Sequence, residues 1–211
     1  MKRSCDIAVI AAGILGLAHA WTAAPRAWIA AQRGLHVTLF ERSPRANAAL
    51  TLNFGMTWPI GQPHGLSRET ALLSRTRWLE LREAFGLWVN ACGPIHPAYR
   101  EDELAVLEEF TGQVILGDSH EYDHDISPFD KQEIDERIPR ELRRIIRLPD
   151  WSIAERWHGI VAKYSEGLIY EAEPQPGAHV VVAPDGVGMT LSFGLAEQQW
   201  TRWAGTTRIV F

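Results

Sequence analysis

The feature that most constrains the fold is the order of patterns within the first 41 residues. A short apolar run at 6–10 leads into a turn of small residues at 11–16. A helical pattern follows from 14 to about 32, and a second strand pattern occupies 36–40. Short, continuous apolar runs are typical of strands that a parallel sheet buries on both faces. This order predicts a βαβ unit and therefore an α/β fold.

The turn matches a dinucleotide-binding fingerprint in two of its three glycines. It reads Ala11-Ala-Gly13-Ile14-Leu15-Gly16, so that alanine replaces the first glycine. Gly13 lets the backbone approach a diphosphate, and Gly16 lets the helix pack closely on the strand. The helix N-terminus then favours the anion. If the turn requires a positive φ, Ala11 is strained there. Simple helix–strand packing is the alternative interpretation of such a partial motif.

Glu41 closes the second strand, where the fingerprint has an acid that binds a ribose hydroxyl. It lies 30 residues after Ala11, whereas the usual interval is about 20. Two similar heptads, 21–27 and 28–34, look like a tandem duplication, and removing one leaves an interval of 23. Pro25, within the first heptad, is expected to kink the helix. We therefore predict that Glu41 binds a ribose, with an ordinary solvated acid as the alternative.

A second glycine turn lies far along the chain, between a strand pattern at 180–183 and a helical pattern at 190–203. Its residues are Gly186, Val187, Gly188, Met189 and Thr190. A helix that starts in this way can face an electron-rich carbonyl or a ring nitrogen that gains charge on reduction. Two such turns predict one extended cofactor that bridges them, and a plain glycine-rich turn is the alternative.

Between the two turns, helical spacing predicts helices at 67–86, 101–110 and 127–146, and short strands at 113–116 and 157–164. Apolar residues make up 46% of the chain and charged residues 22%, so a packed core is expected. The net charge of −5 argues against a nucleic-acid partner. The start of the chain resembles a signal peptide, but Asp6 interrupts its apolar run, which also argues against a membrane span. Two cysteines suit a cytoplasmic location, and no metal-ligand spacing occurs.

Several segments, taken in order, resemble one enzyme family. They are 10–20, Thr38-Leu-Phe-Glu41-Arg42, Asn53-Phe-Gly55-Met56, 117–122, 157–159 and 186–192. The sequence is similar to FAD-dependent oxidoreductases of the D-amino-acid oxidase, glycine oxidase and sarcosine oxidase type. More narrowly, it resembles the branch associated with phosphonate degradation, which is proposed to oxidise aminoethylphosphonate or its N-methyl forms.

The resemblance implies a Rossmann-like FAD-binding domain, a β-rich substrate domain, and hydride transfer from a small amine to the flavin. It assigns FAD contacts to the two turns and to Glu41, Arg42, Asn53, Gly55 and Met56. Most of the substrate domain is missing, because Thr111-Gly112 joins segments that a long β-rich stretch separates in the family. The implied division is 1–110 for the N-terminal part of the FAD domain and 111–211 for its completion with a remnant of the substrate domain.

The candidate catalytic residues are His120, His158 and Lys163, whose positive charges suit a phosphonate. The resemblance places Val161 where amino-acid oxidases have a carboxylate-binding arginine, which argues against an α-amino acid as substrate. Ala11, the heptad pair and Ala48-Ala-Leu50 weaken the case for tight FAD binding. Two other hypotheses stay open: an NAD(P)-dependent dehydrogenase, and an inactive remnant. The sequence does not determine the oligomeric state.

Overall fold

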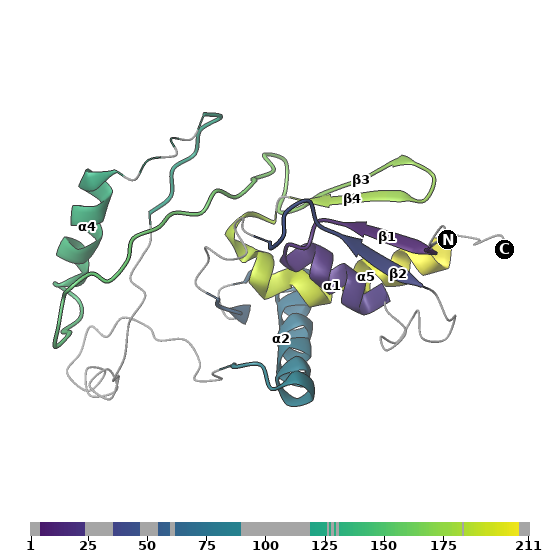
Figure 1. The fold of residues 1–211 in the computed structure, drawn as a ribbon, viewed down its shortest axis with the longest axis horizontal. Helices are drawn as coiled ribbons and strands as arrows, with labels where there is room; N and C mark the ends of the chain where they lie inside the picture. The colour runs from purple at the N-terminus through teal and green to yellow at the C-terminus, as the bar shows by residue number, and fades with distance from the viewer. Residues whose placement is uncertain are drawn as a thin grey trace. The chain divides into compact units, whose positions relative to one another are not determined.

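The computed structural model mixes helices and strands in two compact units (Figure 1). Unit 1 comprises Met1–Ala91 and Val161–Phe211, and unit 2 comprises Cys92–Ile160. The structure describes residues 5–23, 36–46, 55–59, 62–89, 119–125, 127, 129, 131–182 and 184–206. The predicted division between residues 110 and 111 falls outside these ranges and stays a prediction.

The predicted βαβ pattern forms in unit 1. The strands β1 (Ile7–Ile10) and β2 (Val37–Phe40) pair in parallel over all four residues of each, and α1 (Ile14–Ala23) packs against them (Figure 1). Parallel strands require a crossover between them, and the helical pattern after residue 14 supplies its beginning. The described residues thus mix helix and strand in agreement with the predicted α/β class, whereas the later part of the predicted helix, 24–32, lies outside the described residues.

The helix α5 (Gly188–Thr206) is central in unit 1, because it contacts both α1 and α2 (Leu66–Phe85). The apolar core is shared among these three helices. It consists of Ala18, Leu81, Phe193 and Ala196, with Ile14, Trp21, Trp78 and Trp200 packed around them. Trp78 of α2 meets Phe193 of α5 edge to face, with their ring centroids 5.0 Å apart. Helical apolar spacing predicted α2, and the glycine turn at 186–188 predicted the start of α5.

The helices α2 and α5 approach most closely at Gly194. A Cβ atom there would lie 2.0 Å from the carbonyl oxygen of Thr70, so only glycine fits. One turn further along α2, Ser74 is fully buried, and its hydroxyl accepts a hydrogen bond from the N–H of Phe193 at 3.3 Å. The backbones are therefore in direct contact without an intervening layer of side chains.

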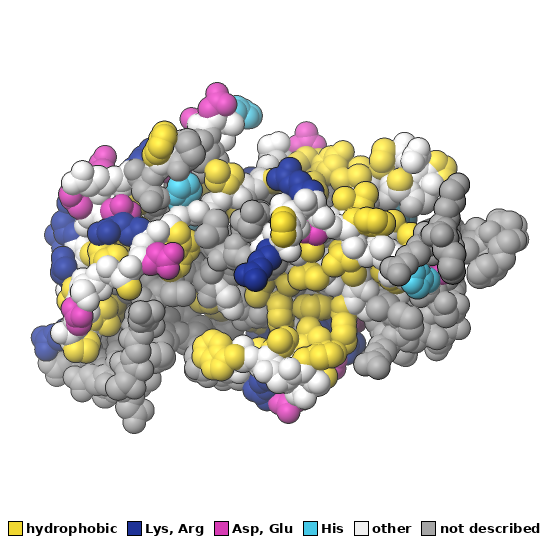
Figure 2. All heavy atoms as spheres, viewed as in Figure 1, with side chains coloured by type: hydrophobic (Ala, Val, Ile, Leu, Met, Phe, Trp, Pro, Cys, Tyr) yellow, Lys and Arg dark blue, Asp and Glu magenta, His cyan; other side chains and the backbone are white. Residues whose placement is uncertain are grey.

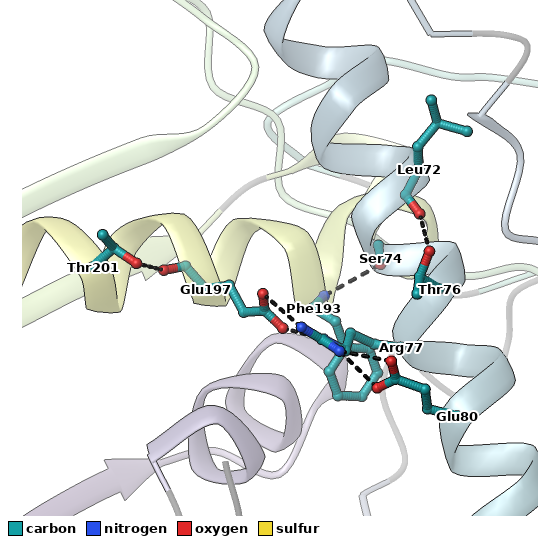
Figure 3. A network of polar contacts seen from close by, with 8 residues as sticks. All are labelled: Leu72, Ser74, Thr76, Arg77, Glu80, Phe193, Glu197 and Thr201. Carbon is teal, nitrogen blue, oxygen red and sulfur yellow. Dashed lines mark hydrogen bonds and ion pairs between the residues drawn. The ribbon is translucent and has the colours of Figure 1, made fainter. Parts of the chain in front are cut away.

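Arg77 adds a charged link across the same contact (Figure 3). Its guanidinium donates to the carboxylate of Glu197 on α5, through Nε and through Nη2, which lies 3.2 Å from Oε2. It also binds both carboxylate oxygens of Glu80 at 2.7 Å. These bonds, led by the one to Glu197, raise the pKa of Arg77. Because the side chains of Arg77 and Glu197 are only 30% and 25% exposed, this pair is more sheltered than an ordinary surface pair.

A β-hairpin completes unit 1. The strands β3 (Tyr170–Gln175) and β4 (Ala178–Val182) pair antiparallel, and Gly177 takes a φ of +80° in their turn. The prediction of a strand at 180–183 is confirmed by β4. The predicted range begins two residues after the observed start and ends one residue after the observed end. β3 was missed because its sequence, Tyr-Glu-Ala-Glu-Pro-Gln, carries two acids and a proline in place of an apolar alternation.

The predicted strand at 157–164 is wrong. Among these residues only Lys163 forms a β-bridge, to Pro184. Ile160 and Val161, which suggested a strand, are 54% and 41% exposed, so no neighbouring layer covers them. Within the described ranges, no helix is long and apolar enough to cross a membrane.

Unit 2 contains the helix α4 (Gln132–Leu142), which lies within the predicted range 127–146. Ion pairs join α4 to its own unit: Asp135 pairs with Arg156 at 3.5 Å, and Lys131, just before the helix, pairs with Glu121 at 2.8 Å. None of the residues of α4 is buried. Charged contacts therefore contribute more to this unit's described part than apolar packing does.

Candidate dinucleotide-binding site

The turn between β1 and α1 has the conformation that its sequence pattern requires. Ala11 takes a φ of +84°, and its N–H donates to the carbonyl of Phe40 at 2.8 Å, which ties the turn to the end of β2. A Cβ atom on Gly16 would lie 1.7 Å from the carbonyl oxygen of Ala11. Gly16 is therefore needed for close packing, and Ala11 occupies backbone space that favours glycine.

Gly13 lies on the open side of this turn. A Cβ atom added there would meet nothing within 4 Å. The first helical bond runs from the N–H of Leu17 to the carbonyl of Gly13 at 2.9 Å, so α1 begins here. The earliest N–H groups of a helix have no partner within it and attract anions. The predicted residues Ile14 and Leu15 belong to this first turn and are half-buried.

Glu41 folds back onto the same turn. Its carboxylate accepts hydrogen bonds from the N–H of Ala12 at 2.8 Å and from that of Ser43 at 3.1 Å. These bonds, led by the one from Ala12, hold the pKa of Glu41 below its usual value, and the side chain stays exposed next to Arg42. The open Gly13 and the helix N-terminus suit an anionic group. The ionised Glu41 already occupies the N–H of Ala12 and adds negative charge beside it, so this carboxylate suits only the hydroxyl groups of a ligand.

The second glycine turn lies against the first. A 3₁₀ turn, Asp185–Val187, leads directly into α5 at Gly188. A Cβ atom on Gly188 would lie 3.5 Å from Cγ2 of Ile14, the first residue of α1. The two turns, 172 residues apart between Gly16 and Gly188, therefore meet in unit 1, as the extended-cofactor hypothesis requires. Gly186 is also open, because a Cβ atom there would meet nothing within 4 Å.

A third predicted segment joins the same place through Thr190. The Thr190 hydroxyl accepts from the N–H of Trp58 at 3.1 Å and donates to the carbonyl of Met56 at 3.5 Å. Gly55 precedes this contact with a φ of +66°, and the Met56 side chain is 54% exposed. Asn53, which the family resemblance also assigns to the cofactor, lies outside the described residues.

Lys163 is the candidate catalytic residue that lies beside these turns. Its Nζ is 3.2 Å from Oδ2 of Asp185, and its backbone bridges to Pro184. Its charge is therefore placed at the entry to the second turn, with an acid already paired to it. Asp185 takes a φ of +51°, so the backbone at this point is held in an uncommon conformation.

His120 and His158 belong to unit 2. The His120 ring stacks on Tyr122 with centroids 6.2 Å apart, and His158 is exposed. Next to His120 is an open cavity of about 300 Å³. The lining residues are Glu121, Tyr122, Asp123, Asp125, Ser127 and Lys131. Three acids against one lysine make this cavity unfavourable for a phosphonate.

Sequence reasoning missed three residues that shape the turn region: Trp58, Trp78 and Asp185. Trp78 donates from Nε1 to the carbonyl of Met189 at 3.2 Å and so ties α2 to the start of α5. Nine tryptophans in 211 residues are many, and they predict core positions or the flank of a ligand cleft, but composition cannot say which tryptophan lies where. Aspartate before a glycine turn is too common to indicate a lysine partner 22 residues earlier.

Comparisons with models of known protein families, with curated proteins and with solved structures found no match for this chain.

Proposed function

We propose that this chain binds FAD along the two glycine turns and oxidises the C–N bond of a small amine. The observation that carries the proposal is the contact between the start of α1 and the start of α5, which brings Gly188 next to Ile14. If one turn holds the diphosphate and the other the flavin ring, the two turns must lie within reach of each other, and this contact supports that arrangement. The Rossmann-like fold and the amine-oxidising activity both belong to this proposal.

Each turn has a distinct part in the proposal. The open backbone at Gly13 and the N-terminus of α1 would hold the diphosphate, and ionised Glu41 would accept from ribose hydroxyls. The start of α5, with Thr190 fixed by its bonds to residues 56 and 58, would face the flavin ring. When bound, FAD supplies the hydride acceptor, and the protein's part is to orient it and exclude water.

Lys163 is the residue best placed to bind an anionic group of the substrate. It lies at the entry to the second turn, and its pairing with Asp185 fixes its position. A phosphonate could share this cation as an additional partner. Val161, two residues earlier, offers no positive charge for a carboxylate. The favoured substrate class is thus a small amine with a phosphonate group.

The test is FAD binding by the full chain and by Gly13→Asp, measured by visible absorption after gel filtration. Aspartate is well tolerated at a helix N-terminus and has room here, so the variant should fold. Its carboxylate would repel a diphosphate, and we expect affinity to fall by about tenfold or more. Gly167→Asp adds the same charge at an exposed position with only ordinary contacts and should bind like the parent.

Failure of the parent chain to bind FAD at excess ligand would refute the cofactor assignment. Equal binding by Gly13→Asp would refute the site. If FAD binds, peroxide release from a panel of amines and aminophosphonates tests the reaction, with artificial electron acceptors as a second readout.

A second candidate is nucleotide binding without catalysis. The observation that favours it is the parallel sheet, which has only two strands within the described ranges, fewer than a doubly wound sheet has. FAD or NADH binding without turnover of any amine in the panel would favour this candidate.

A further inference from the structure

A cluster of rings joins the C-terminal part of α5 to α1 and to the β-hairpin. Trp203 of α5 stacks on His19 of α1, with centroids 5.5 Å apart and 17° between planes. It also stacks on His179 of β4, at 4.0 Å and 8°. Glu171 of β3 accepts from the Gln199 amide at 3.1 Å and from Arg202 at 2.8 Å. We call His19, Trp203, His179, Gln199 and Glu171 the clasp.

The His19 end of the clasp is buried and incompletely satisfied. His19 is 7% exposed and Gln199 0%. Among the described residues, Nε2 of His19 and Oε1 of Gln199 have no hydrogen-bond partner, and neither has Nε1 of the adjacent Trp200. A charged imidazole in this place would lose water and gain no close acid. Burial accordingly lowers the pKa of His19 from 6.5 to about 4, although the Gln199 amide and Glu171 oppose this shift.

The clasp contains one carboxylate, that of Glu171, and His19 shares it with other partners. The Glu171 carboxylate is the anion that acts on His19, but it is already bound to Arg202 and Gln199. Burial opposes its ionised form, and the bonds from Arg202 and Gln199 outweigh burial, so the pKa of Glu171 is lowered. A charge on His179 acts against a second one on His19. Within the described ranges, these are the groups that bear on His19 from α5, β3 and β4.

We propose that the clasp is an acid-sensitive latch that holds the β3–β4 hairpin on α5 and releases it when His19 takes up a proton. The Gln199 amide and the Glu171 charge favour a protonated His19, but burial outweighs them, so uptake of a proton favours a state in which one of the elements around His19 has moved. The hairpin is the weakest of these, because a two-stranded sheet has little stability of its own. In contrast, α1 and α5 share the apolar core. This latch operates whether or not the chain binds a nucleotide.

The test follows the full chain from pH 7 to pH 4 by NMR and by hydrogen exchange. We expect the protection factors of the amides in 178–182 to fall by up to about 80-fold between pH 6.5 and pH 4, because one unit of pKa shift corresponds to tenfold and each end of this range is itself a midpoint. Amides of α2, 66–85, should stay more protected than those of the hairpin at pH 4, because they exchange only when the whole unit unfolds. The indole N–H signal of Trp78, held by Met189, serves as the internal control, and that of Trp203 should move. Hairpin amides that remain as protected as those of α2 at pH 4, or no loss of protection in the hairpin, would overturn the proposal.

The variant His19→Gln distinguishes the effect of protonating His19 from the effect of protonating other groups. Glutamine cannot be protonated, so the variant hairpin should stay protected at pH 4, whereas Glu171→Gln should keep a His19-dependent step. Release that persists in His19→Gln would overturn the assignment to His19. If His19→Gln does not fold, measurements on the parent chain still test the proposal. The His19 ring must then titrate with the same midpoint as hairpin exchange, and differing midpoints would contradict the latch.

Discussion

The two sides of α5 are built in different ways. Toward α2, the helices touch at Gly194, a buried serine receives a backbone N–H, and Arg77 binds Glu197. Toward α1 and the hairpin, stacked rings surround a histidine and a glutamine whose buried polar atoms lack partners among the described residues. The first contact satisfies nearly every group it buries, whereas the second leaves groups that respond to protons. On α5, the contact with α2 is therefore the one whose buried polar groups are paired, and the contact with α1 and the hairpin is the one that holds the buried histidine.

The largest expected effect is at the α2 contact, from Gly194→Ala. The new Cβ would lie 2.0 Å from the Thr70 carbonyl, and neither backbone can yield without separating the helices. We expect the free energy of unfolding to fall by about 3 kcal/mol or more, the upper end of overpacking. Urea denaturation measures this, and Gly167→Ala, with only ordinary contacts at 3.7 Å, should change it by less than about 0.5 kcal/mol. Equal losses in both variants would show that the helices are not so closely packed.

The α1 contact should contribute a pH dependence. His19 has a pKa of about 4 in the folded chain and an ordinary value of 6.5, so below pH 6.5 the unfolded chain binds its proton first. Stability is therefore full above pH 6.5, declines down to pH 4, and changes no further below it on account of this group. The expected loss is about 2 to 3 kcal/mol. Urea denaturation at pH 7 and pH 4.5 should show most of this loss in the parent and not in His19→Gln, and an identical loss in both would exclude His19 as its source.

A double-mutant cycle sharpens the description of the α2 contact. Arg77→Met and Glu197→Gln, alone and together, should give a coupling of about 1 kcal/mol, because both side chains are largely sheltered. The matched cycle between Arg77 and Glu80 should give less than about 0.5 kcal/mol, since Glu80 is 56% exposed. A larger coupling to Glu80 would mean that the link across the two helices is not the dominant one.

The smallest expected effect concerns the turn before α1. Ala11 has a φ of +84°, which costs an L-residue about 1 to 2 kcal/mol, and glycine removes that cost while adding freedom to the unfolded chain. Ala11→Gly should therefore stabilise the chain by about 0.5 kcal/mol. Thermal unfolding would detect this as a small rise in Tm. A fall in Tm would indicate that the turn does not hold this conformation in solution.

Local patterns made much of unit 1 predictable. The apolar run 7–10 predicted the strand β1, but burial on both of its faces is wrong, because its residues are alternately half-buried and exposed and Ile10 is 82% exposed. Helical apolar spacing predicted α2, and the second glycine turn predicted the start of α5. The convergence of the two turns was expected from the family resemblance and the paired glycine motifs. β3 was not predictable, because its glutamates serve contacts such as Glu171 with Gln199 rather than an apolar face.

The candidate site was predictable in its backbone and not in its side-chain partners. Glycine indicates positions where backbones approach closely or turn, so Gly13, Gly16 and Gly188 could be assigned to the two turns from the sequence. The pairing of Lys163 with Asp185 and of Thr190 with residues 56 and 58 depends on long-range packing. The type of a single polar residue does not indicate which distant residue it contacts. His120, His158 and Lys163 therefore looked equivalent in the sequence, although they belong to two different units.

The contact between α2 and α5 has a consequence for biosynthesis. Arg77 and Glu197 are separated by 120 positions in the chain. A ribosome that has completed the βαβ segment and α2 must add more than a hundred further residues before α5 emerges to cover them. During that interval the apolar sides of α1 and α2 are exposed to water or to chaperones. Slow synthesis should therefore lower the yield of folded protein, and early co-expression of holdase chaperones should restore it.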